Sequence, residues 1–110
     1  MQHRYCLALD LKEDENLIKE YEAYHQKVWH EILDSIKHSG IEYMEIYRAG
    51  NRLFMIMEVN DTFSFKAKAK ADATNEKILQ WEKLMWQYQQ ALPFAKPGEK
   101  WVLMNKIFGL

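Results

Sequence analysis

The chain has 110 residues, 48% of them apolar and 28% charged, with a formal net charge of -1 at pH 7. This length predicts a single domain over residues 1–110, and the near-zero charge with scattered positive residues argues against nucleic-acid binding. The only cysteine, Cys6, excludes an internal disulfide, and we find no apolar run for a signal peptide or a membrane span, so we expect a cytoplasmic protein without membrane contact.

The first elements are predicted from alternation and helical spacing. Residues 4–11 alternate between apolar and other side chains, which predicts a strand. Asp14 is a typical helix N-cap, and acidic residues beside it suit the positive end of a helix. Apolar positions then recur every three or four residues, which predicts one helix over residues 14–38 that ends at Ser39-Gly40.

The later elements follow from turn residues and further periodicity. In order, we expect a strand over residues 41–48, a tight turn over 49–51, a strand over 52–59, a helix opened by Asp61 or Thr62 and ending near 71, a helix over 75–90, and a strand over 101–108. The turn joins its two strands into a hairpin. Pro93 and Pro97-Gly98 mark a loop before the last strand.

This order of elements predicts an α+β fold. Strand, helix, strand, strand, helix, strand is the ferredoxin-like βαββαβ sandwich, in which helices cover one face of an antiparallel sheet. Residues 53–57 are apolar without interruption, so both faces of that strand need cover. A second copy of the chain is expected to cover the outer face, giving a homodimer through the sheet, as in dimeric α/β barrels. The alternative is an apolar sheet face that stays partly exposed.

His25 is the best candidate for a proton-transfer group. It follows Tyr21 by four residues, so the two side chains are neighbours on the apolar stripe of the predicted helix. Histidine is the side chain whose ordinary pKa lies near neutrality. The same pattern also fits a core histidine with both nitrogens satisfied, and Tyr21 and Trp81 also fit core aromatics. The residues alone leave both interpretations open.

Motifs for cofactors and metals are absent from the sequence. His25 and His30 are five residues apart and do not share a helix face, so no metal-ligand pattern forms. The four glycines are too scattered for a phosphate loop, and there is no G-x-S-x-G nucleophile motif. We therefore expect neither a cofactor nor a metal.

A resemblance gives these residues a function. The pattern Tyr-x-x-x-His-x-x-x-Trp-x-Glu, formed by Tyr21, His25, Trp29 and Glu31, resembles the first-helix signature of the L-rhamnose mutarotase family. The similarity continues through Gly40, the Ile46-Tyr47 pair, Met57-Glu58 and the segment from Trp81 to Met85. It implies a cytoplasmic, cofactor-free, dimeric α+β isomerase that interconverts sugar anomers. It also implies that His25 is the proton donor and that Tyr21 and Trp81 contact the monosaccharide.

Two departures from the family pattern affect the expected substrate. The chain has Met44 where the family typically has a ligand-contacting tyrosine, and Glu82 where it has a second tryptophan. These changes make L-fucose at least as good a candidate as L-rhamnose, because a polar site rejects analogues that leave its groups unpaired. Tyr21, Glu82 and a water remain open as the second acid–base group. A cofactor-free oxygenase or a non-catalytic sugar-binding dimer of the same fold is the alternative function.

Overall fold

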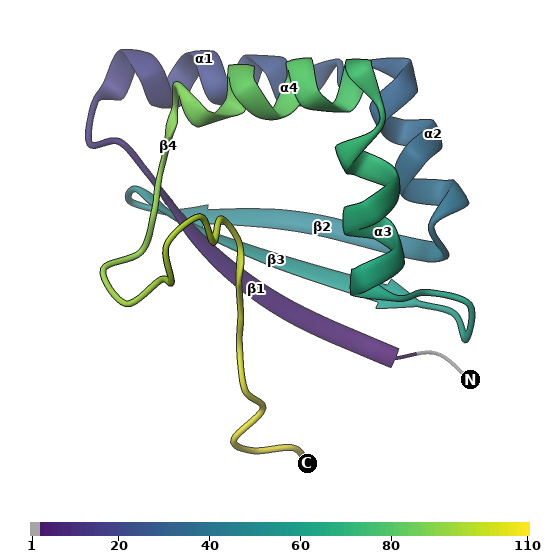
Figure 1. Ribbon diagram of the computed structural model, residues 1–110. Coiled ribbons are helices and arrows are strands. Elements are labelled where there is room, and N and C mark those ends of the chain that lie inside the picture. Colours follow the sequence, from purple (N-terminus) through teal and green to yellow (C-terminus); the bar gives the residue numbers. More distant parts are fainter. Residues whose placement is uncertain (1–2) are drawn as a thin grey trace.

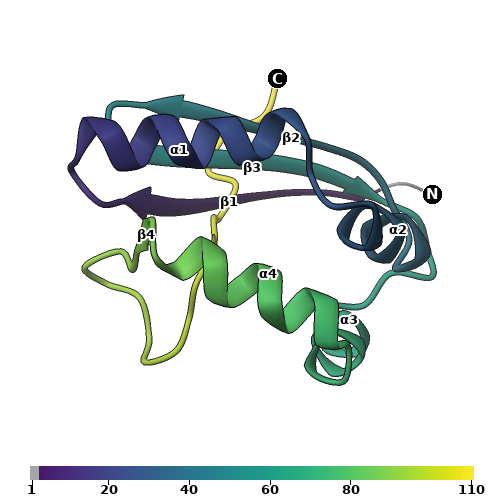
Figure 2. The same ribbon diagram turned by 90° about the horizontal axis from the view of Figure 1, so that it is seen from above.

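The computed structural model describes residues 3–110 and arranges helices over a sheet (Figure 1). Its elements are β1 (His3–Leu11), α1 (Glu15–Gln26), α2 (His30–His38), β2 (Ile41–Ala49), β3 (Arg52–Val59), α3 (Phe65–Ala73), α4 (Glu76–Trp86), β4 (Gln89–Gln90) and β5 (Val102–Leu103). Seen from above, α1 and α4 run side by side along the sheet, while α2 and α3 lie together at one end (Figure 2).

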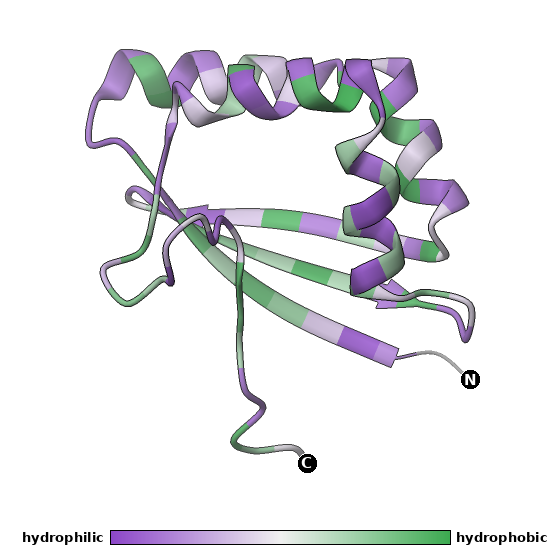
Figure 3. Ribbon diagram, viewed as in Figure 1, coloured by the Kyte–Doolittle hydropathy of each residue, from purple (hydrophilic) through white to green (hydrophobic). Residues whose placement is uncertain are grey.

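The sheet confirms the ferredoxin-like α+β prediction. Its strand order is β2-β3-β1-β4, and all pairings are antiparallel. Side chains of β3 alternate, so that Met55 and Met57 are buried whereas Phe54 and Ile56 are half-buried. The buried set packs into the core and the other set lies on the face that the helices do not cover. Figure 3 shows hydrophobic and hydrophilic segments alternating along β2, whereas β3 is hydrophobic over most of its length.

The prediction of one helix over residues 14–38 is wrong in one respect, because this segment forms two helices. α1 ends at Gln26 and α2 begins at His30, and the intervening Lys27 has the non-helical angles φ −147° and ψ 74°. Val28 and Trp29 pack against the core cluster that contains Tyr21. Burying these two side chains offsets the backbone hydrogen bonds lost at the break, since tertiary packing supplies most helix stability.

The segment after α4 differs from the prediction because two short stretches of it pair with β1. The helix expected to reach residue 90 ends at Trp86, and Gln89-Gln90 instead pair with β1 at Asp10 and Leu11. β4 thus occupies one stretch of the free edge of β1, and β5 pairs only at Leu7-Ala8. The strand expected over residues 101–108 is therefore two residues long.

Side-chain caps define the starts of three helices. Asp14 accepts hydrogen bonds from two backbone N–H groups of α1, as expected. Ser64, not Asp61 or Thr62, caps α3 by accepting from the Ala67 N–H at 3.1 Å. Asn75 caps α4 in the same way. Each cap is worth about 1 kcal/mol of helix stability.

The core consists of two clusters. One contains Tyr21, Trp81, Met85 and their neighbours from α1, α2 and α4. The other is centred on the sheet and includes Leu7, Met55 and Met57. Within residues 3–110, no helix combines the length and the apolar character needed to cross a membrane.

Candidate active site

A cavity of about 640 Å³ lies between the helices and the sheet, within the usual size range of small-molecule sites. Members of both core clusters line it, so it marks the place where the two clusters do not close on each other. The strands contribute the apolar side chains Leu7, Met44, Ile46, Met55 and Met57. Its polar groups come from the helices, from β4 and from the loop before β5.

His25 lines this cavity with one nitrogen already bonded. The ring is half-buried, and its Nδ1 lies 2.8 Å from the backbone oxygen of Tyr21. A carbonyl oxygen only accepts, so Nδ1 carries a hydrogen and the lone pair of the neutral ring is on Nε2. The Tyr21 ring also contacts the imidazole, with centroids 4.4 Å apart. His25 is therefore held in one tautomer, with Nε2 available for proton transfer.

Tyr21 presents a neutral hydroxyl beside this histidine. The side chain is only 3% exposed. Burial raises the pKa of the Tyr21 phenol to about 12, the hydrogen bond from Gln89 opposes this, and the charge of Glu82 adds to the increase. The phenol therefore stays protonated near neutral pH. Gln89 Nε2 donates to Tyr21 Oη over 3.1 Å.

Trp81 forms an aromatic wall next to His25. Its indole is 6% exposed and lines the cavity. The rings of Tyr24, His25 and Trp29 contact it edge to face, at centroid distances of 6.3, 5.8 and 5.1 Å. Edge-to-face contacts of this kind favour a fixed ring orientation. The site thus combines an imidazole oriented by a hydrogen bond with an apolar surface oriented by ring contacts.

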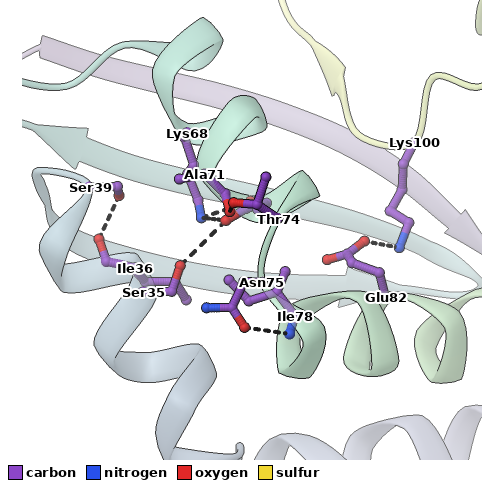
Figure 4. A network of polar contacts seen from close by, with 11 residues as sticks. Ser35, Ile36, Ser39, Lys68, Ala71, Thr74, Asn75, Ile78, Glu82 and Lys100 are labelled. Atoms are coloured by element: carbon purple, nitrogen blue, oxygen red, sulfur yellow. Dashed lines mark hydrogen bonds and ion pairs between the residues drawn. The ribbon is translucent and has the colours of Figure 1, made fainter.

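An ion pair lies at the same end of the cavity. Lys100, from the loop before β5, forms a close ion pair with Glu82 on α4 (Figure 4). The Lys100 ammonium also lies 4.8 Å from the centroid of the Trp86 ring. Both charged residues line the cavity. The pair connects the C-terminal segment to α4 and places opposite charges beside the aromatic wall.

A second polar cluster lies at the α2–α3 end of the cavity. Lys68 Nζ contacts both carboxylate oxygens of Asp72, at 3.0 and 3.1 Å. Ser35 of α2 donates to the same carboxylate over 3.4 Å, which links the two helices. Figure 4 shows Ser35 and Lys68 converging from their separate helices. These polar groups satisfy one another.

The structure brings together the three residues singled out from the sequence, His25, Tyr21 and Trp81, around one cavity. The departures Met44 and Glu82 line it as well, whereas Glu31 is exposed on α2 and does not. Several polar lining residues are not revealed by the sequence patterns, among them Gln89 and Lys100 near His25. In the part of the chain described, no three His, Cys, Asp or Glu side chains gather as a metal site requires.

Gln89 and Lys100 give little signal in the sequence. Periodicity places Gln89 at the end of a helix, where one glutamine among several is unremarkable, and Lys100 follows a loop. Only a shorter helix ending at Trp86 moves Gln89 into a strand beside β1. The bulky apolar residue pattern from Ile78 to Met85 fits a helix but does not mark where it stops.

The fold and the cavity define a small α+β protein with an internal cavity, lined by a histidine and an indole and within the size range of small-molecule sites. The chain belongs to the L-rhamnose mutarotase family, a family of isomerases that act on sugars, and it matches that family over residues 4–110. The resemblance drawn from the first-helix pattern is thereby confirmed.

Individual proteins are similar to this chain over nearly its whole length. The chain is 45% identical to an L-fucose mutarotase of Xanthomonas campestris pv. campestris, over 97% of this chain and 87% of the relative. It is 36% identical to a UPF0734 protein of Dictyostelium discoideum, over 96% of this chain and 88% of that protein. The crystal structure of an L-rhamnose mutarotase from Formosa agariphila superposes with a TM-score of 0.71, covers 98% of both chains and is 20% identical, which supports the fold.

Proposed function

We propose that this sugar mutarotase interconverts the α and β anomers of L-fucose, with L-rhamnose as the poorer substrate. The L-fucose preference is supported by the 45% identity to an L-fucose mutarotase. It is also supported by the cavity, where Met44 and Glu82 replace the family's tyrosine and second tryptophan. The observation that carries the mechanism is the His25 ring, fixed through Nδ1 and lining the cavity.

His25 Nε2 is the proposed proton donor and acceptor. Nε2 takes the proton of the anomeric hydroxyl, and the imidazolium delivers it to the ring oxygen as the bond between C1 and the ring oxygen breaks, which opens the ring to the aldehyde. Rotation about C1–C2 and closure on the other carbonyl face then give the other anomer. The hydrogen bond from Nδ1 to the Tyr21 carbonyl holds the ring in place during both proton transfers. Positioned acid–base groups contribute roughly 10² to 10⁴ in rate, which is enough for a reaction that already proceeds in water.

Tyr21 and Trp81 are the proposed substrate-binding residues. The Tyr21 hydroxyl remains neutral, because burial raises its pKa to about 12, and so it can donate to a sugar oxygen. Trp81 presents an apolar surface next to His25, suited to the methyl group and C–H face of a 6-deoxyhexose. Together they would hold the sugar's ring oxygen toward the imidazole.

Exchange of the anomeric protons tests this activity directly. Saturation-transfer NMR on L-fucose and on L-rhamnose should show faster anomer exchange with the protein than in buffer, with the larger acceleration for L-fucose. Binding calorimetry with both sugars and with an aromatic polyphenol accompanies it. Sugar binding without acceleration would identify a sensor and contradict the proposal, and selective polyphenol binding would point to the oxygenase class.

A homodimer through the outer sheet face is the second part of the proposal. Phe54 and Ile56 are only half-buried there, and Tyr47 beside them is 54% exposed. The C-terminal segment extends beneath this face with Ile107 96% and Phe108 77% exposed (Figures 1 and 2). A second copy, related by a two-fold axis, would cover both the face and the segment. A cytoplasmic location, consistent with the single cysteine, is proposed with it.

Sedimentation velocity tests the dimer. Ile56→Glu places a charge on the outer face and should shift the protein from dimer to monomer. Leu79→Glu is the matched control, since Leu79 is 48% exposed on α4, away from this face. A wild-type monomer, or an Ile56→Glu variant that sediments as the wild type does, would contradict the arrangement.

A further inference from the structure

Gln89 is a buried polar residue of the cavity that takes no part in the proton transfers at His25. It lies on β4, paired in register with Leu11 of β1, and is 4% exposed. Its backbone is tied to the end of β1, where the preceding Tyr88 carbonyl also accepts from the Lys12 N–H over 2.9 Å. Its neighbour Gln90 is exposed on the same strand. The Gln89 side chain lines the cavity, where its hydrogen bond to Tyr21 holds it.

The direction of the Gln89–Tyr21 hydrogen bond has a chemical consequence. Gln89 Nε2 donates to Tyr21 Oη, so the phenol oxygen serves as the acceptor. A phenol has a single hydrogen of its own, and in this arrangement that hydrogen stays free to be donated elsewhere. Tyr21 also lines the cavity, where a sugar oxygen can accept it.

The amide oxygen of Gln89 indicates that this residue does not serve stability alone. Gln89 Oε1 is buried and has no hydrogen-bond partner among residues 3–110. An unpaired buried acceptor destabilises a fold, and an apolar side chain of the same length would avoid it. Retaining a glutamine in spite of this penalty is typical of a residue that acts in function.

We propose that Gln89 is a positioning residue: its Nε2–H engages Tyr21 Oη so that the phenol hydrogen is donated to the bound sugar. This inference rests on the proposed function. The amide acts through Tyr21, and its loss would free the phenol to rotate away from the sugar. Substrate binding would weaken while proton transfer at His25 continued.

The test compares Gln89→Met, Gln89→Glu and the matched surface control Gln90→Met. With L-fucose, Gln89→Met should raise KM about fivefold, the effect of one hydrogen bond, while kcat changes little. Its Tm should equal or exceed that of the wild type, because the orphan acceptor is gone. Gln89→Glu should raise KM further, because a carboxylate only accepts and would take the phenol hydrogen for itself. Gln90→Met should match the wild type.

Combining the variants separates positioning from a structural role. In a Tyr21→Phe background, Gln89→Met should change KM no further, because the group it positions is already absent. An unchanged KM in Gln89→Met, a fall in activity that merely follows a fall in Tm, or full additivity with Tyr21→Phe would each overturn the inference. A wild type that accelerates exchange of neither sugar would instead refute the proposed function itself.

Discussion

The two ends of the cavity differ in how their polar groups are satisfied. At the α2–α3 end, Lys68, Asp72 and Ser35 bond to one another. At the α1–α4 end, Gln89 Oε1 has no partner within residues 3–110, and His25 is bonded through Nδ1. Networks that satisfy themselves stabilise a fold, whereas polar groups left available at a cavity can bind a ligand. The difference supports the proposal that the chemistry takes place at the α1–α4 end.

The largest expected effect comes from His25, and His38 provides its control. Both rings bond through Nδ1 to the carbonyl four residues earlier, at 2.8 Å for His25 and 3.0 Å for His38. Only His25 lines the cavity. In saturation-transfer NMR with L-fucose, His25→Gln should lower the enzymatic exchange rate by roughly 10² to 10⁴, and His38→Gln should leave it unchanged. Equal exchange rates for the two variants would contradict the placement of the chemistry at the α1–α4 end of the cavity.

Tyr21→Phe should have the next largest effect. Loss of the donated hydrogen bond should raise KM for L-fucose about tenfold, measured from exchange rates at increasing sugar concentration. Because no positive or negative charge is removed near neutral pH, the variant should keep the fold, checked by circular dichroism. An unchanged KM would show that the hydroxyl does not contact the sugar.

The same variant carries a pH prediction. An unfolded tyrosine ionises near its ordinary pKa of 10, whereas Tyr21 in the fold stays protonated up to about 12. The unfolded state therefore loses its proton first, and the wild type should lose stability as the pH rises from about 10 to 12. Tyr21→Phe should lack that part of the loss, on the order of 2 kcal/mol, in urea unfolding at several pH values. If the wild type and Tyr21→Phe lose the same free energy of unfolding over this pH range, burial does not raise the pKa of Tyr21.

Glu82→Gln should have a smaller effect. It breaks the ion pair with Lys100 at the cavity while keeping the side-chain size. We expect KM for L-fucose to rise about threefold, because a partly exposed ion pair contributes little free energy. The preference for L-fucose over L-rhamnose should become smaller. Glu76→Gln, in the first turn of the same helix, is the control. If both variants bind the two sugars as the wild type does, the ion pair takes no part in specificity.

Asp72→Asn should have the smallest effect. It weakens the pair with Lys68 at the satisfied end of the cavity. The free energy of unfolding should fall by about 1 kcal/mol or less, and the exchange rate should stay within about twofold of the wild type. A loss of activity comparable to that of Tyr21→Phe would mean that the α2–α3 end also binds substrate.

The fold is largely predictable from the sequence because local patterns agree with the tertiary contacts. Alternation places the strands at 4–11, 41–48 and 52–59 to within a residue or so, and the Asp14 cap marks the start of α1. The break after Gln26 is not predictable, because no glycine or proline marks it. It results from packing of Val28 and Trp29 against elements distant in the sequence.

The site is predictable only in part, for related reasons. His25 and Tyr21 share a helix, so their spacing alone identifies them as neighbours. Gln89 reaches Tyr21 only because β4 pairs with β1, a contact that depends on where α4 ends. Lys100 meets Glu82 across a loop whose course no local pattern determines.

The central claim is that His25 Nε2 is the atom that faces the sugar and moves the proton. Long-range ¹H–¹⁵N NMR of the histidine rings, with and without L-fucose, tests it most directly. We expect the free protein to show His25 as the Nδ1–H tautomer, and the Nε2 resonance of His25 to shift on addition of L-fucose while that of His38 stays in place. An Nε2–H tautomer at His25, or an Nε2 resonance that does not respond to the sugar, would contradict the claim.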